Sequence, residues 1–199
     1  MHRIVLASGN QGKLRELNRA LADLELEVVP QSDYGVEDAI EDGLSFVENA
    51  LIKARHASRL TGLPALADDS GLEVDCLDGA PGIYSARYAG EGAGDAANNA
   101  KLVAALAGVP DEQRSARFQC LLVLVRHPED PVPLICQGSW EGRILDAPRG
   151  VNGFGYDPLF YIPELGCCSA ELTAEQKNRL SHRGQAVAKL VRKLSALSA

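Results

Sequence analysis

Two periodicities of hydrophobic residues alternate along the chain. Arg3–Ala7 (RIVLA) is a short apolar run rich in β-formers, and residues 13–24 then repeat leucine at helical spacing. Comparable apolar runs predict further strands at 26–28, 63–67, 118–125, 132–140 and 159–162. Helical spacing with start and stop residues predicts helices over 13–24, 47–62, 95–106 and 186–194. Thr173 with Gln176 three residues later has the capping-box pattern of a helix start.

Strands and helices mix without strict βαβ alternation, so we expect an α/β layered fold in which helices flank a mixed sheet. The strands at 118–125 and 132–140 are separated by a proline-rich turn, which is typical of a long hairpin. No internal repeat, low-complexity tract or linker divides the sequence. Residues 1–199 are therefore predicted to form one domain.

Composition narrows the class of protein. The sequence is 46% apolar, enough for a sizeable core, yet it has no run of the ~18 apolar residues that a membrane span requires. Its first apolar stretch is too short for a signal peptide, so we expect a cytoplasmic protein. The formal net charge of -7 argues against a broad basic surface for nucleic acid. A small polyanion would need a local basic pocket and a divalent ion.

The five cysteines form no CxxC pair, so we expect free thiols rather than disulfides or zinc ligands. Cys120 and Cys136 lie in apolar runs and are predicted to be buried. The vicinal pair Cys167-Cys168 has two interpretations, a redox feature or a loop that tolerates small residues.

A loop between the first strand and the first helix has the residues of a phosphate site. Glycines let backbone N–H groups approach an anion, and a lysine stands at the start of a helix. The spacing is not that of a Walker A loop, because only two residues separate the glycines and Leu14 follows the lysine. An ordinary glycine-containing turn is the alternative. The residues concerned are Ser8, Gly9, Asn10, Gln11, Gly12 and Lys13.

Two adjacent carboxylates, Asp68 and Asp69, are predicted at the end of the strand 63–67. Successive side chains of a strand point to opposite faces, so the two acids are expected to have different roles. Mg²⁺ prefers one or two carboxylates plus phosphate oxygens. A second ligand could come from the acids Glu37, Asp38, Glu41 and Asp42. On composition alone, an acidic pair in a loop is usually a solvated turn.

Two further groups could hold the rest of a nucleotide. Lys53 on the second helix, and Lys177, His182 and Arg183 near the last one, supply cations in a chain that is acidic overall. Phe154 stands between glycines, where a planar ligand could stack on it or where it could fill a hydrophobic gap.

Taken in order, these segments resemble the inosine/xanthosine triphosphate pyrophosphatase family, from Ile4 to about Ala188. The resemblance is carried by six motifs: SGNQGK at 8–13, ENA at 48–50 with Lys53-Ala54, ADDSGL at 67–72, GAPGIYSAR at 79–87, FGYDP at 154–158 and SHRG at 181–184. Ser8 stands where many members have threonine, a change that keeps the hydroxyl.

The resemblance implies a long twisted mixed sheet, two lobes with a central substrate cleft, a homodimer and Mg²⁺. It implies hydrolysis of inosine, deoxyinosine and xanthosine triphosphates to monophosphate and pyrophosphate, which keeps these nucleotides out of DNA and RNA.

The resemblance also implies a role for each candidate residue. Asp69 would be proton acceptor and metal ligand, with Glu41 our choice as second ligand. The 8–13 loop would bind the triphosphate, and Ser70 would contact substrate. Our own hypothesis adds Lys13 and Lys53 on the outer phosphates. The nucleoside end would be held by Phe154, Gly155, Tyr156, Asp157, Lys177, His182 and Arg183.

Two other classes of function compete with this one. A sensor module would bind triphosphates without hydrolysing them. The carboxylates of Asp68 and Asp69, which could bind a metal ion, argue against this function. A pyrimidine-nucleotide hydrolase of the Maf type would share the opening loop but would not be expected to carry Ser181-His182-Arg183.

Overall fold

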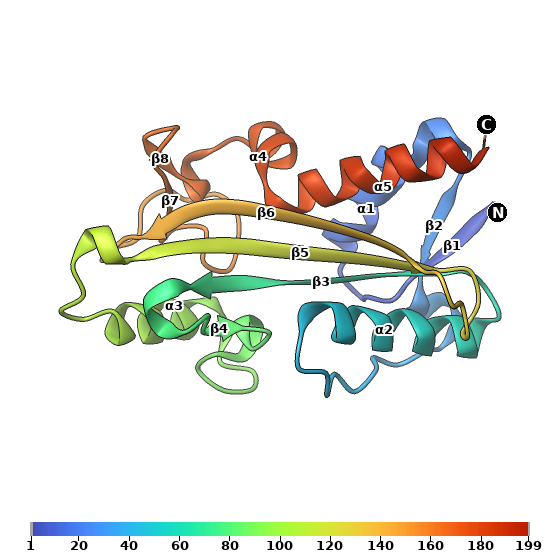
Figure 1. Ribbon diagram of the computed structural model, residues 1–199, viewed down its shortest axis with the longest axis horizontal. Coiled ribbons are helices and arrows are strands. Elements are labelled where there is room, and N and C mark those ends of the chain that lie inside the picture. Colours follow the sequence, from blue (N-terminus) through green and yellow to red (C-terminus); the bar gives the residue numbers. More distant parts are fainter. Residues whose placement is uncertain (1, 199) are drawn as a thin grey trace. The chain divides into compact units, whose positions relative to one another are not determined.

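The computed structural model describes residues 2–198 and has a mixed sheet flanked by helices (Figure 1). The strands are β1 (Arg3–Leu6), β2 (Glu27–Pro30), β3 (Ala65–Val74), β4 (Pro81–Gly82), β5 (Ser115–Val125), β6 (Leu134–Ile144), β7 (Phe160–Ile162) and β8 (Cys167–Cys168). The α-helices are α1 (Gln11–Leu21), α2 (Phe46–Thr61), α3 (Gly94–Ala105), α4 (Ala174–Leu180) and α5 (His182–Ser198).

The strand order in the sheet is β2-β1-β3-β5-β6-β7-β8, with β4 paired to β3. Strand β1 runs parallel to both β2 and β3, whereas β4 is antiparallel to β3 and β7 is antiparallel to β6 and β8. The predicted α/β fold with a mixed sheet is therefore confirmed.

The chain forms two compact units, each made of separate segments. Unit 1 comprises the chain up to Asp69, Cys120–Gln137 and the chain from Gln185 on; unit 2 comprises Ser70–Gln119 and Gly138–Gly184. Strands β3, β5 and β6 each contribute residues to both units. The prediction of one domain and of a cleft between lobes stays a prediction.

Unit 1 has three layers, and the alternation of side chains along its strands decides which residues meet which helices. One set packs with α1 and α5: Ile4, Leu6, Leu66, Leu122 and Leu124. The residues between them pack with α2: Val5, Ala7, Ala65, Ala67, Val123 and Val125. In Figure 1, α1 and α5 lie on one side of these strands and α2 on the other. Alanines on α2 allow that helix to lie close to the sheet.

Unit 2 has one aromatic-rich core. Phe118, Trp140 and Phe160 pack together, with ring centroids 4.5 Å apart for Phe118–Phe160 and 5.5 Å for Trp140–Phe160. Leu102 of α3 and Leu106, which follows that helix, belong to the same cluster, and so does Tyr156 of the loop before β7. The core therefore anchors the loop that carries Phe154.

Local signals place the helix ends. Ser45 caps α2 by accepting from the Glu48 N–H, and Gly62 ends that helix at φ +70°, a conformation that favours glycine. The capping box predicted at Thr173 and Gln176 is present in both directions at the start of α4.

Two sequence predictions differ from the structure, and one short strand was not predicted. Strand β3 continues through the acidic pair to Val74, so Asp68 and Asp69 lie inside a strand and not at its end. Cys167-Cys168, weighed as a loop, forms the short strand β8 on β7. Pro81–Gly82, within the motif at 79–87, forms the two-residue strand β4 on β3. These short strands are made by tertiary pairing, which overrides weak local preference.

All five cysteines are free thiols, and Cys120 and Cys136 are buried as predicted. Within residues 2–198, none of the helices is both long enough and apolar enough to span a bilayer.

Candidate active site

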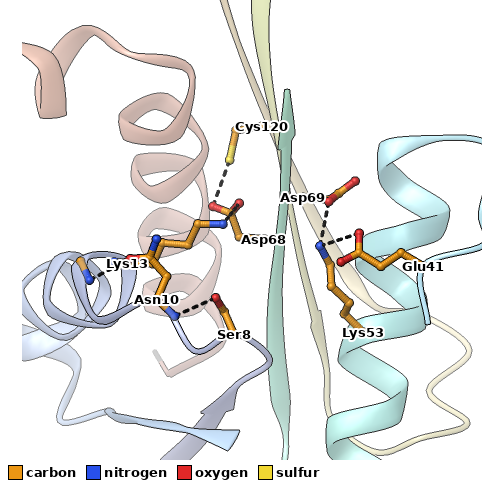
Figure 2. A network of polar contacts seen from close by, with 9 residues as sticks. Ser8, Asn10, Lys13, Glu41, Lys53, Asp68, Asp69 and Cys120 are labelled. Carbon is orange, nitrogen blue, oxygen red and sulfur yellow. Dashed lines mark hydrogen bonds and ion pairs between the residues drawn. The ribbon is translucent and has the colours of Figure 1, made fainter. Parts of the chain in front are cut away.

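Asp68 and Asp69 point to opposite faces of β3, because they are neighbours in a strand. Asp68 shares the face of Leu66, which packs with α1 and α5, and Asp69 shares the face of Ala67, which packs with α2. Figure 2 shows each carboxylate meeting a different lysine on its own side of the strand. The expectation of two distinct environments is confirmed.

On the α1 face, Asp68 is buried and pairs with Lys13 Nζ at 2.7 Å. The thiol of Cys120, on the neighbouring strand β5, lies 3.6 Å from the other oxygen of Asp68. Lys13, in the first turn of α1, is thus fixed by a carboxylate 55 residues away in sequence. The arrangement holds one ammonium group beside the 8–13 loop (Figure 2).

On the α2 face, Lys53 lies between two carboxylates. Its Nζ is 2.7 Å from Asp69 Oδ1 and 3.3 Å from Glu41 Oε2. The side chains of Lys53 and Asp69 are largely buried, and that of Glu41 is about a third exposed. Of the four acids predicted as possible second ligands, Glu41 is the one with an ion pair to Lys53 in the structure.

Burial raises the pKa of Asp69 to about 6, against the lowering effect of Lys53, and the carboxylates of Glu41 and Asp68 add to the rise. Burial lowers the pKa of Lys53, but the charge and hydrogen bond of Asp69, together with Glu41, outweigh it, so that pKa is raised. At neutral pH Lys53 is therefore charged, and Asp69 is a carboxylate with higher proton affinity than an exposed one.

The α2 face fits Mg²⁺ in donor type. Asp69 Oδ2 is buried and has no hydrogen-bond partner among residues 2–198, which leaves an acceptor available in a desolvated position. Residues 2–198 contain no group of three or more His, Cys, Asp or Glu side chains able to hold a metal. Asp69 and Glu41, which both lie beside Lys53, are carboxylates of the kind that Mg²⁺ takes one or two of, completing its shell with water and phosphate oxygens.

The 8–13 loop is built around the helix cap of Asn10. Its Oδ1 accepts from the Gly12 and Lys13 N–H groups at 2.8 and 3.1 Å, and its own N–H donates to Ser8 Oγ. Among the described residues, the exposed N–H groups of Gly9 and Gln11 have no partner. These two amides, at a helix N-terminus beside Lys13, can donate hydrogen bonds to an anion.

Unit 2 holds the second predicted group, around Asp157. This buried carboxylate accepts from Phe154 N–H at 2.8 Å and Ser169 Oγ at 2.8 Å, and it pairs with Lys177 Nζ. Gly153 passes so close that a Cβ there would lie 2.1 Å from Asp157 Oδ2. Asp157 therefore shapes the loop that presents Phe154.

Phe154 is 60% exposed, with Lys177 Nζ at 4.5 Å and the Arg183 guanidinium at 5.9 Å from its ring centroid. His182 is buried and stacks on Phe118, with ring centroids 4.8 Å apart. An exposed aromatic ring beside two cations offers stacking and hydrogen-bond donors together, as a base with carbonyl oxygens requires.

Tyr156 belongs to the core and not to the exposed face of the loop. It is buried, its hydroxyl donates to Ser85 O at 2.7 Å, and burial raises the pKa of this phenol. Tyr156, whose side chain was predicted to contact substrate, thus anchors the loop to the core of unit 2.

Two α3 residues that sequence reasoning missed hold Gly155. Asp95 Oδ2 accepts from Gly155 N–H at 2.6 Å, and Asn99 Nδ2 donates to Gly155 O at 2.8 Å. Their i, i+4 spacing puts both on one helix face, a pattern readable in the sequence, but nothing local links that face to residues about 56 positions later.

Comparisons with known proteins identify the family to which the chain belongs. The profile of the Ham1 family matches residues 4–193, almost the whole chain. The chain belongs to the Ham1 family. This confirms the family expected from the sequence motifs.

Curated relatives of this Ham1 chain match along nearly their full length. The chain is 62% identical over 190 residues to a protein of Vibrio cholerae, covering 96% of the chain and 95% of the relative, and 63% identical over 198 residues to one of Xanthomonas oryzae pv. oryzae, covering all of both. Both relatives are named dITP/XTP pyrophosphatase.

Solved structures give the same family. A HAM1 protein from Coxiella burnetii matches with a TM-score of 0.95 and 52% identity, covering 98% of this Ham1 chain and 100% of that one. A nucleoside-triphosphatase / dITP/XTP pyrophosphatase from Mycobacterium abscessus matches with a TM-score of 0.80 and 46% identity, covering 94% and 98%.

The predicted residues of this Ham1 chain therefore fall into two groups. Unit 1 holds the 8–13 loop, Glu41, Lys53 and Asp69, and unit 2 holds the residues around Phe154 together with Lys177, His182 and Arg183. Ser70 follows Asp69 in β3 and is the first residue of unit 2. The roles assigned to these residues stay predictions.

Proposed function

We propose that this chain hydrolyses non-standard purine nucleoside triphosphates, dITP and XTP with their counterparts ITP and dXTP, to the monophosphate and pyrophosphate with Mg²⁺. Such an activity keeps these nucleotides from entering DNA and RNA. Support comes from membership of the Ham1 family and from the names of relatives about 60% identical over nearly the whole chain.

One observation carries the assignment of the chemistry to unit 1. Asp69 presents a buried oxygen with an available lone pair, and its other oxygen is held by Lys53, which also holds Glu41. A carboxylate whose orientation is fixed in this way is prepared to bind a cation and to accept a proton.

Asp69 and Glu41 would hold Mg²⁺, which when bound neutralises charge on the phosphates and on the departing pyrophosphate. Asp69 accepts the proton of a water molecule whose oxygen forms the new bond to the α-phosphorus. The bond from that phosphorus to the bridging oxygen of the β-phosphate breaks, and pyrophosphate leaves. The burial that raises the pKa of Asp69 increases its affinity for this proton.

Lys13 and Lys53 act on charge. Each is held by an aspartate of β3, at 2.7 Å, so each ammonium is positioned before substrate arrives. Preorganised cations that meet developing negative charge provide the main stabilisation in phosphoryl transfer. The free amides of Gly9 and Gln11 would add two donors for phosphate oxygens.

Unit 2 would read the base. Phe154 would offer a face for stacking, and Arg183, whose guanidinium lies near that ring, would donate together with His182 to the 6-oxo group that hypoxanthine and xanthine share. The 6-amino group of adenine is itself a hydrogen-bond donor and would face these donors. Buried polar groups left unpaired in this way strongly weaken binding of the wrong base. Guanine must be rejected through its 2-amino group.

The test is product analysis with a panel of bases. Purified protein is incubated with Mg²⁺ and dITP, XTP, dGTP or dATP, and pyrophosphate and orthophosphate are measured separately. We expect pyrophosphate from dITP and XTP and far less from dGTP and dATP. Equal rates for all four would refute the base-reading role, and orthophosphate as the product would refute the reaction.

The proposal includes a homodimer and a cytoplasmic location, which the resemblance and the sequence led us to expect. Light scattering on the purified full chain tests the first: a mass near twice 21.2 kDa is expected, and a mass near 21.2 kDa at all concentrations would exclude the dimer.

A further inference from the structure

Asn49, near the start of α2, is fully buried, and the two polar atoms of its side chain differ in their hydrogen bonding. Its Oδ1 accepts from the Gly43 N–H at 2.9 Å, whereas its buried amide nitrogen has no partner among residues 2–198. An unpaired buried donor destabilises the fold, and an apolar side chain of similar size would avoid that cost. The contact that Asn49 does make therefore merits a functional explanation.

That contact holds a loop against the helix at very short range. A Cβ at Gly43 would lie 2.7 Å from both Asn49 Oδ1 and Glu48 Cβ, so only glycine permits the approach. Glu48 adds a second tie by accepting from the Leu44 N–H at 3.0 Å. The start of α2 thus fixes two consecutive backbone amides of the loop.

The loop carries Glu41 two residues before Gly43, and residues 36–43 have no regular secondary structure of their own. Their position depends on side-chain ties rather than on a backbone ladder. Lys53, which pairs with Glu41, stands one turn after Asn49 in α2. One helix therefore holds the loop by Asn49 and the Glu41 carboxylate by Lys53.

We propose that Asn49 is a positioning residue: by holding Gly43 it places the Glu41 carboxylate beside Lys53 and Asp69, ready for a divalent cation. The inference rests on the proposed function, in which Glu41 and Asp69 hold Mg²⁺. Asn49 itself touches neither metal nor substrate in this account.

The experiment is a titration of the full chain with Mn²⁺ alone, without nucleotide, followed by electron paramagnetic resonance. Asn49→Ala and Gly43→Ala reach the loop from its two sides, and each should weaken Mn²⁺ binding by about 10- to 100-fold, as loss of an outer-shell partner does. Glu41→Gln should weaken it at least as much. If Asn49→Ala does not fold, Gly43→Ala decides the question.

Asn18→Ala is the matched control. Asn18 also clamps a backbone in unit 1, exchanging hydrogen bonds of 2.8 and 2.9 Å with Val28, but it holds β2 and not the Glu41 loop. It should lower the melting temperature and leave Mn²⁺ affinity unchanged.

Wild-type affinity in both loop variants, with weakened binding in Glu41→Gln, would overturn the positioning role and leave the proposed function standing. Wild-type affinity in Glu41→Gln would overturn both the positioning role and the assignment of Glu41. Release of pyrophosphate from dITP, measured on the same samples, reports separately on the reaction itself.

Discussion

At the scale of single residues, two adjacent carboxylates acquire different chemistry from the pleat of one strand. Asp68 faces α1 and is paired with Lys13, with Cys120 against its other oxygen. Asp69 faces α2, shares Lys53 with Glu41, and keeps one oxygen unpaired among residues 2–198. Only Asp69 therefore has an acceptor in reserve for a metal ion and a proton.

Asp69→Asn tests this difference. The amide keeps the shape of the side chain but cannot accept the proton of the attacking water, so kcat for dITP should fall by about 10²- to 10⁴-fold while the protein stays folded. Steady-state kinetics with pyrophosphate detection measures the effect. Glu27→Gln, in an exposed ion pair with Arg3, serves as control and should keep wild-type kinetics. Near-normal turnover in Asp69→Asn would remove Asp69 from the mechanism.

Asp130 closes the turn between β5 and β6, and we expect it to stabilise the folded protein. The buried Asp130 carboxylate accepts hydrogen bonds from the backbone N–H and the guanidinium of Arg126, and from the Val132 N–H at 3.0 Å. The hydrogen bonds from Arg126 hold the pKa of Asp130 well below its usual range. Asp130→Asn should lower the free energy of unfolding by about 1–2 kcal/mol at pH 7.

The pH dependence follows from the sign of that shift. A carboxylate whose folded pKa is depressed stabilises the protein above its unfolded pKa of about 3.9, and this contribution is lost as the pH falls toward the folded value. In urea unfolding, the difference between wild type and Asp130→Asn should be constant from pH 7 to 5 and shrink below about pH 4. As a control, Asp23→Asn, at an exposed position, should match wild type at every pH. A difference in the free energy of unfolding between wild type and Asp130→Asn that stays the same at all pH values would show that the Asp130 charge does not contribute.

At the scale of elements, α3 supports the Phe154 loop through Asp95 and Asn99, which hold the two sides of Gly155. Asn99→Ala removes one hydrogen bond to Gly155 and should make the position of Phe154 less fixed. KM for dITP should rise by about fivefold, which corresponds to the loss of one neutral hydrogen bond, and kcat should change little. The adjacent Asn98→Ala removes bonds to Ala86 and Ala89 instead and should lower stability without raising KM. Equal KM values in both variants would mean that α3 does not position the loop.

The same scale shows how far the sequence could predict the fold. Helices and strands with a clear apolar period were placed within a few residues, and the capping box at Thr173 was confirmed. Strand β3 was cut short because Asp68, Asp69 and Ser70 are typical of turns. Buried ion pairs with Lys13 and Lys53 offset the cost of placing those acids in a central strand, and these pairs are invisible in local sequence.

For the site, the pleat of the strand predicted opposite directions for Asp68 and Asp69, but not their partners. Lys13 lies 55 residues from Asp68, and the clamp on Gly155 joins positions 56 to 60 residues apart. Spacing can indicate that a residue is on a given face of a strand or helix. Only tertiary folding decides which distant residue it meets.

At the scale of the whole molecule, an acidic chain with a net charge of -7 must bind a highly charged anion. Fixed lysines in unit 1 and the cations near Phe154 in unit 2 supply local positive charge, and a divalent ion would complete the neutralisation.

Chelation tests that balance. EDTA should abolish turnover of dITP, because two carboxylates beside Lys53 would otherwise repel the triphosphate, and excess Mg²⁺ should restore it. The melting temperature should change little, since Lys53 already neutralises part of the charge of Asp69 and Glu41. Full activity in EDTA would exclude the metal from the reaction.

Attack of water at the α-phosphorus of a non-standard purine triphosphate can be followed by isotope tracing. The chain is incubated with dITP and Mg²⁺ in water enriched in ¹⁸O, and the products are weighed by mass spectrometry. We expect one ¹⁸O in the monophosphate and none in pyrophosphate. Label in pyrophosphate, or release of labelled orthophosphate, would contradict it.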